Sequence, residues 1–301
     1  MCGIVGLFSK NSNISDNLGS HFNNMLETMG HRGPDSAGFA IYRNNQTNKK
    51  LDLKICLFHR NNEFQWKHFC KQLKKDLNCD FTHEALSNHL LLTTDCDYST
   101  FNQWLFAEFP DINIMSAGEK IEIYKEKGYP TEVAHKFKLS ELTGSHAIGH
   151  TRMATESAIT TAHSHPFSTG LDICLVHNGS LSNHHSLRRF LTRNNIRFQS
   201  DNDSEVASGY LSYLLASGCT LKEALEQSIN ELDGFYTFAV GTKNGFAVLR
   251  DPIACKPAVL AETDDWVAMA SEFRALATLP NIEKADIWEP APATVYNWEL
   301  N

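Results

Sequence analysis

The chain opens with Met1-Cys2-Gly3-Ile4-Val5-Gly6, and the interpretation of the whole sequence starts here. Residues 4–8 form a short apolar run typical of a buried strand, which would hold the preceding cysteine on a rigid element. Methionine is usually removed before a small residue, so we expect the mature chain to begin with Cys2. Its α-amine would titrate near pH ~7.7–8.0 and could accept the thiol proton. One residue would then supply nucleophile and general base, although a cysteine at position 2, taken alone, is more often an ordinary residue.

The segments that follow this strand predict an α+β protein. Apolar residues at 18, 22, 25, 26 and 29 recur at helical spacing, and Gly30 would end that helix. Beyond residue 140, the runs 173–176, 235–240, 246–249 and 267–269 are typical of strands, and 203–215 and 221–232 have helical patterns. Strands that cluster between helices without strict alternation favour α+β layers over a doubly wound sheet.

Residues 44–140 are more polar and charged than the segments on either side. Their pattern predicts strands at 51–58, 90–93, 112–115 and 121–124, with helices at 64–77 and 101–109. This order is close to that of a ferredoxin-like unit. We therefore predict an inserted α/β unit over residues 44–140, with a core formed by residues 1–43 and 141–301.

Composition excludes several classes of protein. The 301 residues include 27 Lys and Arg against 35 Asp and Glu, a net charge of −8, which disfavours nucleic acid and anionic membranes as partners. No apolar stretch reaches the ~18–20 residues that cross a bilayer, and a signal peptide pattern is missing. The eight cysteines are too dilute for a disulfide scaffold and none stand as CxxC. We expect a cytoplasmic protein with reduced thiols.

Six segments in a fixed order carry a family resemblance. The opening Met1-Cys2-Gly3-Ile4 and the segment His31-Arg32-Gly33-Pro34-Asp35-Ser36-Ala37-Gly38 resemble the class II glutamine amidotransferases. The later segments fit the same family in order: Gly149-His150-Thr151-Arg152, His177-Asn178-Gly179, Asp201-Asn202-Asp203-Ser204-Glu205, and Arg250-Asp251-Pro252 with Lys256-Pro257. Ala270-Ser271-Glu272 is similar to the segment that closes the family's sheet. The resemblance covers residues 1–43 and roughly 145–298, and implies a four-layer αββα N-terminal-nucleophile (Ntn) hydrolase sandwich.

The resemblance also implies roles for individual residues. Cys2 would attack the carboxamide of L-glutamine, and Asn178 and Gly179 would donate to the oxyanion from a tight turn. Arg152, with help from Thr155, would bind the α-carboxylate of the substrate, and Asp203 would pair with its α-ammonium. Arg32 and Asp35 would pack over the N-terminal cysteine and orient it.

Each of these residues also has an ordinary structural interpretation. Asn-Gly is the commonest turn pair, Arg152 could be a surface residue, and Asp203 could cap a helix. Met153 and Glu156 depart from the pattern of well-studied members of the family. His163 and His165 could suggest a metal, but no third ligand stands at convincing spacing, so we expect no metal.

The amino-acid sequence of three segments resembles that of one subfamily, the amidotransferase subunit of split glutamate synthases, including N-methylglutamate synthase. These segments are residues 151–157, 233–242 and 254–257. The resemblance implies a separate synthase subunit that receives the ammonia and carries FMN and iron–sulfur clusters. We expect no cofactor in this chain, because it has no Gly-rich phosphate loop and its cysteines lack cluster spacing.

Two other functions stay open at this point. The chain could hydrolyse another γ-glutamyl amide, such as γ-glutamylmethylamide, or it could be a regulatory subunit without turnover. Residues 44–140 could be a docking module for the synthase or an insertion without a function of its own.

Overall fold

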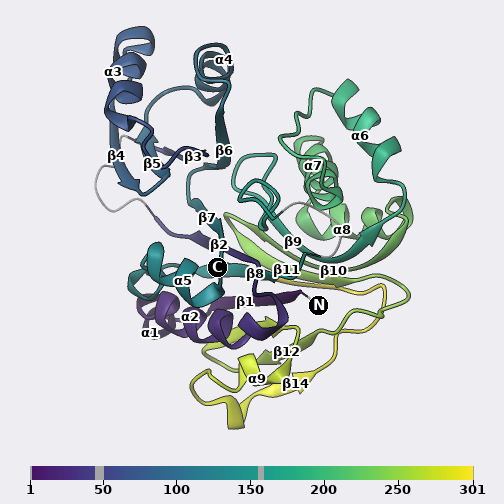
Figure 1. Ribbon diagram of the computed structural model, residues 1–301. Coiled ribbons are helices and arrows are strands. Elements are labelled where there is room, and N and C mark those ends of the chain that lie inside the picture. Colours follow the sequence, from purple (N-terminus) through teal and green to yellow (C-terminus); the bar gives the residue numbers. More distant parts are fainter. Residues whose placement is uncertain (1, 45–50, 155–158, 301) are drawn as a thin grey trace.

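The computed structural model describes residues 2–44, 51–154 and 159–300, and within them the strands form three sheets (Figure 1). The largest sheet has the order β14 (Asp286–Trp288), β12 (Val259–Glu262), β13 (Trp266–Ala270), β1 (Gly3–Ser9), β8 (His146–Arg152), β2 (Ser36–Tyr42) and β7 (Ile121–Lys127). The second has the order β15 (Val295–Glu299), β11 (Gly245–Arg250), β10 (Gly234–Thr242) and β9 (Cys174–Leu181). The third has the order β4 (Phe81–Leu86), β5 (His89–Thr94), β3 (Leu53–His59) and β6 (Ile112–Gly118).

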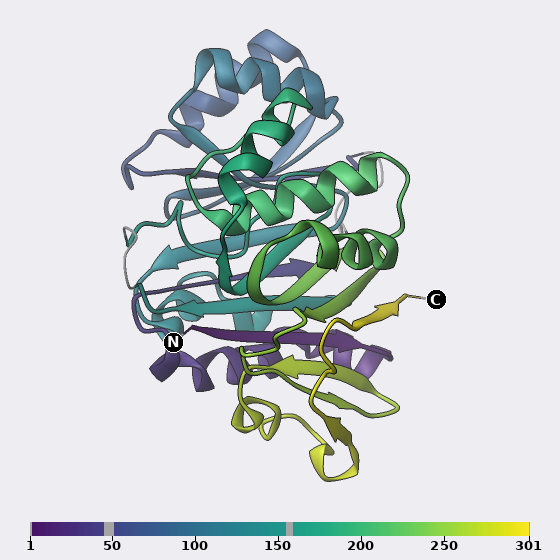
Figure 2. The same cartoon turned by 90° about the vertical axis from the view of Figure 1, so that its right-hand side faces the viewer.

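The first two sheets pack face to face between two layers of helices, as Figures 1 and 2 show. On β1, Val5 and Leu7 lie in an apolar cluster with the helices that cover the largest sheet, α1 (Ser12–Asp16), α2 (Leu18–Thr28), α5 (Pro130–Lys136) and α9 (Phe273–Leu276). Ile4 and Phe8 point the other way, into the cluster between the two sheets. A third cluster joins the second sheet to α6 (His184–Arg193), α7 (Asp203–Ala216) and α8 (Leu221–Glu231). The expected four-layer αββα sandwich is confirmed.

Close packing of the two sheets explains one glycine of the opening motif. A Cβ atom on Gly6 would lie 2.7 Å from Cε2 of Phe246, on β11 of the facing sheet. β1 is therefore an inner strand that is buried on both faces. Its N-terminal end, where Cys2 lies, is labelled N in Figure 2.

The inserted unit follows the βαββαβ order of the ferredoxin-like fold. Its chain order is β3, α3 (Trp66–Leu77), β4, β5, α4 (Tyr98–Glu108) and β6, and the sheet order β4-β5-β3-β6 matches that fold. The sequence pattern missed β4, because its middle residues are exposed and carry little apolar periodicity.

The inserted unit is also shorter than the predicted range 44–140. β7 pairs with β2 along its whole length in the large sheet, and α5 packs in the outer helix layer of the core. β7 has a polar sequence because its buried Glu122 is paired with Arg43 at 2.8 Å and Lys54 at 2.7 Å. Burial raises the pKa of Glu122, but these two cations outweigh it and the pKa is lowered. Residues 121–136 therefore belong to the core and not to the insertion.

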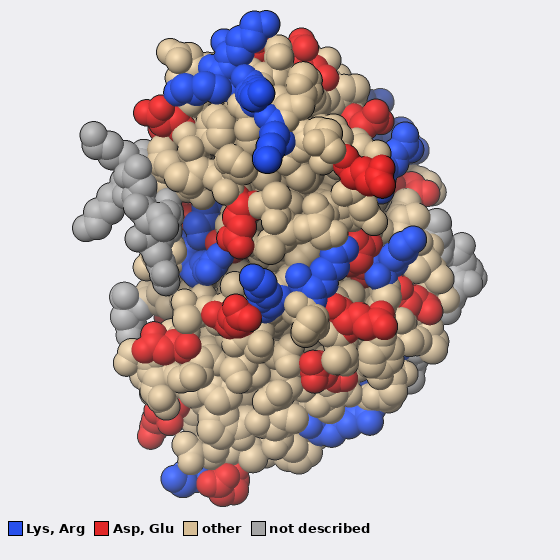
Figure 3. Space-filling model, turned by 60° about the vertical axis from the view of Figure 1, so that its left-hand side comes forward, with Lys and Arg blue, Asp and Glu red and all other residues tan. Residues whose placement is uncertain are grey.

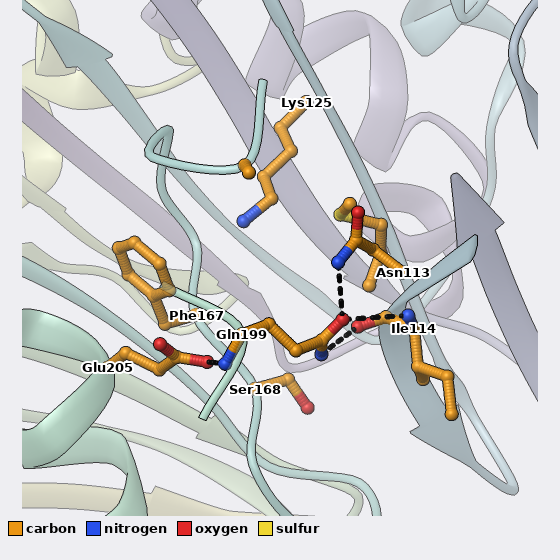
Figure 4. A pocket seen from close by; sticks show the side chains of 9 residues that line it. Asn113, Ile114, Lys125, Phe167, Ser168, Gln199 and Glu205 are labelled. Carbon is orange, nitrogen blue, oxygen red and sulfur yellow. Dashed lines mark hydrogen bonds between the residues drawn. The ribbon is translucent and has the colours of Figure 1, made fainter. Parts of the chain in front are cut away.

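Gln199 ties the inserted unit to the helical layer of the core. Its Oε1 accepts from Nδ2 of Asn113 and the backbone N–H of Ile114, both at 3.0 Å, and its Nε2 donates to the Ile114 carbonyl at 2.8 Å. The side chain therefore pairs with the edge strand β6 as a neighbouring backbone would. Figure 4 shows these contacts at a pocket that is also lined by Lys125 and Glu205.

Among the described residues, no helix combines the length and apolar character that a membrane span requires.

Buried histidines predict how stability depends on pH. Burial lowers the pKa of His89 and of His146 from 6.5 to about 3, so both are neutral in the folded chain. The unfolded chain binds more protons than the folded chain between these values, so the free energy of unfolding falls as pH drops below 6.5. Each group contributes a slope of at most about 1.4 kcal/mol per pH unit. Urea unfolding at a series of pH values measures this dependence.

His146→Gln tests the assignment, with His68→Gln on the exposed face of α3 as the matched control. We expect the first variant to have a shallower pH dependence and the second to match the parent protein. An equal slope in all three proteins would contradict the prediction.

Candidate active site

Cys2 lies at the N-terminal end of β1, and its backbone is held by three neighbours. Nε of Arg32 donates to the Cys2 carbonyl oxygen at 3.0 Å, and Nδ2 of Asn178 donates to the same oxygen at 3.2 Å. Two residues further along the chain, Ser271 accepts from the Ile4 N–H with its hydroxyl at 2.9 Å and donates its own N–H to the Ile4 carbonyl at 2.9 Å. The position of the thiol is therefore fixed by contacts from both sheets.

The Cys2 thiol is half-buried and has an unusually low pKa. Burial raises this pKa, but the hydrogen bond and charge of His150 and the backbone of Met153 lower it, from 9.0 to about 7. The Met153 N–H points at Sγ over 3.4 Å. A pKa near 7 gives a substantial thiolate fraction at neutral pH, and the thiolate is the nucleophilic form.

His150 connects the thiol to Asn178. The His150 side chain is buried on β8, and its Nε2 lies 3.0 Å from Oδ1 of Asn178. Because Nδ2 of Asn178 donates to Cys2, Oδ1 is the acceptor and Nε2 carries the proton. In the neutral ring, Nδ1 is then the unprotonated nitrogen. This Nδ1 atom is buried without a hydrogen-bond partner among the described residues.

Asn178 and Gly179 lie inside strand β9, so the expected tight turn is wrong. Asn178 pairs with Thr237 and Gly179 with Tyr236 on β10. Gly179 has φ +150°, and a Cβ there would lie 1.9 Å from the Phe235 carbonyl oxygen. Glycine is required at this position by close backbone approach. Asn178 lies against the cysteine as the sequence predicted, although the pair does not end the strand.

Arg32 and Asp35 have different neighbours. Arg32 is buried and also forms an ion pair with Glu272, which the sequence analysis did not identify as a supporting residue. Asp35 does not bond to the cysteine: its Oδ2 accepts from the Ala154 N–H at 2.8 Å, and its own N–H donates to the Arg152 carbonyl at 3.1 Å. It therefore orders the segment that follows β8.

The residues expected to bind the substrate end of the site lie on two elements. Arg152 ends β8 and is buried, one residue before Met153 at the thiol. Thr155 and Glu156 lie outside the described residues. Asp203 begins α7, but Asn202 caps this helix by accepting from the Ser204 N–H at 2.8 Å. Asp203 instead accepts from the Leu181 N–H at 2.9 Å, just beyond Gly179.

His163 and His165 point to separate partners. Nε2 of His163 lies 2.8 Å from Asp201, and Nε2 of His165 lies 2.8 Å from the Ser204 hydroxyl. Among the residues that the structure describes, no group of three or more His, Cys, Asp or Glu side chains could hold a metal ion. The His165 ring contacts the His150 ring, with ring centroids 4.1 Å apart, so it belongs to the polar network behind the thiol.

Sequence reasoning missed three supporting residues: His150, Ser271 and Glu272. All three stand inside segments that carried the family resemblance, so their position was visible in the sequence. Their contacts were not, because pairing of β8 and β13 with β1 in the largest sheet brings these segments to the neighbourhood of Cys2.

Comparison with known proteins agrees with this geometry. A model described as a glutamine amidotransferase domain matches residues 150–278. The glutamine amidotransferase-like protein GlxB of Rhizobium meliloti (strain 1021) is 50% identical over 99% of this chain and 98% of its own length. This chain belongs to the glutamine amidotransferase family. The class-level resemblance inferred from the six segments is thereby confirmed.

Two solved structures share the fold of this glutamine amidotransferase. The glutamine phosphoribosylpyrophosphate amidotransferase from B. subtilis, complexed with ADP and GMP, has a TM-score of 0.61 at 20% identity, covering 99% of this chain and 49% of that chain. A structure described as the allosteric regulatory enzyme of purine biosynthesis has a TM-score of 0.63 at 20% identity, covering 98% of this chain and 46% of that chain. At this identity the likeness concerns the fold alone.

The low pKa of Cys2 predicts the pH dependence of its alkylation. The rate of reaction with iodoacetamide should reach half its maximum near pH 7, since the thiolate reacts. In His150→Gln the lowering influence is lost, and we expect the midpoint to move toward 9.0. Mass spectrometry of the N-terminal peptide measures the rate.

His163→Gln is the matched control, since His163 is paired with Asp201 away from the thiol. Its midpoint should equal that of the parent protein. A midpoint near 7 in His150→Gln would show that His150 does not lower the thiol pKa.

Proposed function

We propose that this chain hydrolyses L-glutamine to glutamate and ammonia through a γ-glutamyl thioester on Cys2. The observation that carries the proposal is the Cys2 thiol with a pKa of about 7, placed beside His150 and Asn178. A nucleophile, a base and an amide donor meet at one strand end. This is the set of groups that acyl transfer from a carboxamide requires.

In the first step, Sγ attacks the carboxamide carbon and the bond to nitrogen breaks. In a chain that begins at Cys2, the α-amine takes the thiol proton and passes it to the departing ammonia. Nδ1 of His150 is a second acceptor for that proton. Water then attacks the thioester, glutamate leaves, and Sγ recovers its proton.

The oxyanion of each step would be bound by Nδ2 of Asn178 and the N–H of Gly179. The present hydrogen bonds of Nδ2, to Cys2 at 3.2 Å and to Ser271 at 3.3 Å, are long. The amide therefore loses little when it turns to a substrate oxygen. Removing one such donor typically lowers kcat by about 10²–10³.

The amino-acid end of glutamine would be bound by Arg152, Thr155 and Asp203. The position of Asp203 next to β9 supports this role. Its carboxylate accepts from the N–H of Leu181, which lies two residues after Gly179 on that strand. A guanidinium binds a carboxylate with two parallel hydrogen bonds, and a carboxylate pairs with an ammonium. These groups would contact only the α-carboxylate and α-ammonium, which all γ-glutamyl amides share.

Ammonia would pass to a separate synthase subunit of the glutamate synthase or N-methylglutamate synthase type. Support comes from the resemblance of residues 151–157, 233–242 and 254–257 to the amidotransferase subunits of split glutamate synthases. FMN and iron–sulfur clusters would belong to that partner. The inserted unit lies outside the layers of the core and is our candidate for the docking module.

Cys2→Ala should abolish glutaminase activity, because no other group replaces the thiolate. Cys2→Ser should retain little, since a hydroxyl stays protonated at neutral pH. Release of glutamate and ammonia measures activity, and circular dichroism checks that the variants fold. Cys255→Ala, at an exposed cysteine, is the control and should keep full activity. Full activity in folded Cys2→Ala would contradict the mechanism.

Asp203→Asn should raise the KM for glutamine by roughly 10–100-fold, the cost of losing a charged partner for the α-ammonium. The amide oxygen of Asn can still accept from Leu181, so the local fold is kept. The same increase is expected with γ-glutamylmethylamide, because both substrates share this end. Asp201→Asn, on an exposed carboxylate, is the control. An unchanged KM in Asp203→Asn would remove Asp203 from the substrate site.

A further inference from the structure

Two free cysteines of the inserted unit face each other across a hairpin. The β4–β5 pairing runs from Leu86 opposite His89 to Phe81 opposite Thr94. Continuing the same register by two residues places Cys79 opposite Cys96. Neither cysteine forms a disulfide bond in the structure.

Contact between the two segments extends one residue beyond the strands. The Asp95 N–H donates to the Asp80 carbonyl at 3.2 Å, and the Asp80 N–H donates to Oδ1 of Asp95 at 2.8 Å. Cys79 and Cys96 are the next residues outward, and the Cys96 N–H donates to Oγ1 of Thr94 at 3.1 Å. Disulfides span Cα separations of about 4.4–6.8 Å, which is the range of residues that lie opposite each other on antiparallel strands.

The two thiols are neighbours beyond the paired ends of β4 and β5, and they differ in access. Cys96 is buried, whereas Cys79 is half-buried with Sγ 3.5 Å from the Leu77 carbonyl. Burial raises the pKa of Cys96, and the neighbouring Cys79 raises it further. Cys79 is therefore the thiol that an external oxidant reaches first.

Charge around Cys79 favours an anionic oxidant. Nζ of Lys74 donates to the Cys79 carbonyl at 3.0 Å, and Lys67, Lys71 and Lys75 are exposed on the same helix α3. Figure 3 shows positive side chains gathered at the top of the molecule, where the inserted unit lies. Asp80, paired with Lys74 at 2.9 Å, and Asp95 offset part of this charge.

We propose that Cys79 and Cys96 are a redox-active pair that a small disulfide, such as glutathione disulfide, converts to an intramolecular disulfide. The Cys79 thiolate attacks the oxidant, one thiol leaves, and a mixed disulfide forms on Cys79. Cys96 then attacks Sγ of Cys79 and expels the second thiol. The cysteine pair loses two electrons and two protons. The oxidant disulfide takes them up and becomes the two released thiols.

The disulfide would link the start of the edge strand β4 to the end of β5. Closing the loop from 79 to 96 limits the unfolded chain and stabilises the hairpin. In a reducing compartment the pair stays a dithiol. The ratio of disulfide to dithiol in the inserted unit would therefore depend on the redox potential of its surroundings.

The test uses the reduced full-length chain in glutathione buffers of increasing disulfide content. Samples are unfolded in denaturant that contains N-ethylmaleimide, which alkylates the remaining free thiols. They are then digested without reductant and analysed by mass spectrometry. We expect a cross-linked Cys79–Cys96 peptide, together with a rise in Tm that dithiothreitol reverses. Cys96→Ala should instead retain glutathione on Cys79. Cys79→Ser should form no cross-link and show no rise in Tm.

Cys219→Ser, at a half-buried cysteine between α7 and α8, is the matched control and should behave as the parent protein. A parent protein that keeps glutathione on Cys79, or that joins Cys79 to another cysteine, would overturn the proposal. So would a Tm increase of equal size in Cys79→Ser. These readouts do not depend on glutaminase activity.

Discussion

The carbonyl oxygen of Cys2 receives two hydrogen bonds, and the arrangement of the site depends on them. Arg32 donates from the turn before β2, and Asn178 donates from β9 in the facing sheet. Because Asn178 belongs to the sheet that faces β1, Cys2 keeps both contacts only while the sandwich stays packed. Burial of Ile4 and Val5 on opposite faces of β1 supplies that packing. The fold and the site thus share one strand.

A buried polar network extends from the thiol to the start of α7. His150 contacts Asn178 and the ring of His165, while His165 and His177 both contact the hydroxyl of Ser204. Burial lowers the pKa of His165 and of His177, which are therefore neutral. Buried polar groups are costly unless they are paired, so this network restricts how the strands and α7 can move. Ser204 adjoins Asp203, which places the candidate ammonium-binding group on the same support.

The sequence predicted the layers and the place of Cys2 at the start of a buried strand, because both depend on local patterns. The apolar run after Cys2 indicated the buried strand, and the ordered segments brought Asn178 and Arg32 to it. The assignment of a segment to a sheet was predicted wrongly where it depends on pairing between residues far apart in the sequence. β7 looks polar because Arg43 and Lys54 neutralise its Glu122, and Asn178-Gly179 looks like a turn although β10 continues the pairing. The supporting roles of His150 and Glu272 also required the three-dimensional pairing.

The central claim is that Sγ of an N-terminal Cys2 attacks the substrate carboxamide. The most direct measurement is labelling of native protein with a diazoketone analogue of glutamine, followed by intact mass and peptide mapping. We expect one adduct on Sγ of Cys2, on a chain that has lost Met1, and protection by glutamine. An adduct on another residue, or full turnover by a chain that retains Met1, would contradict it.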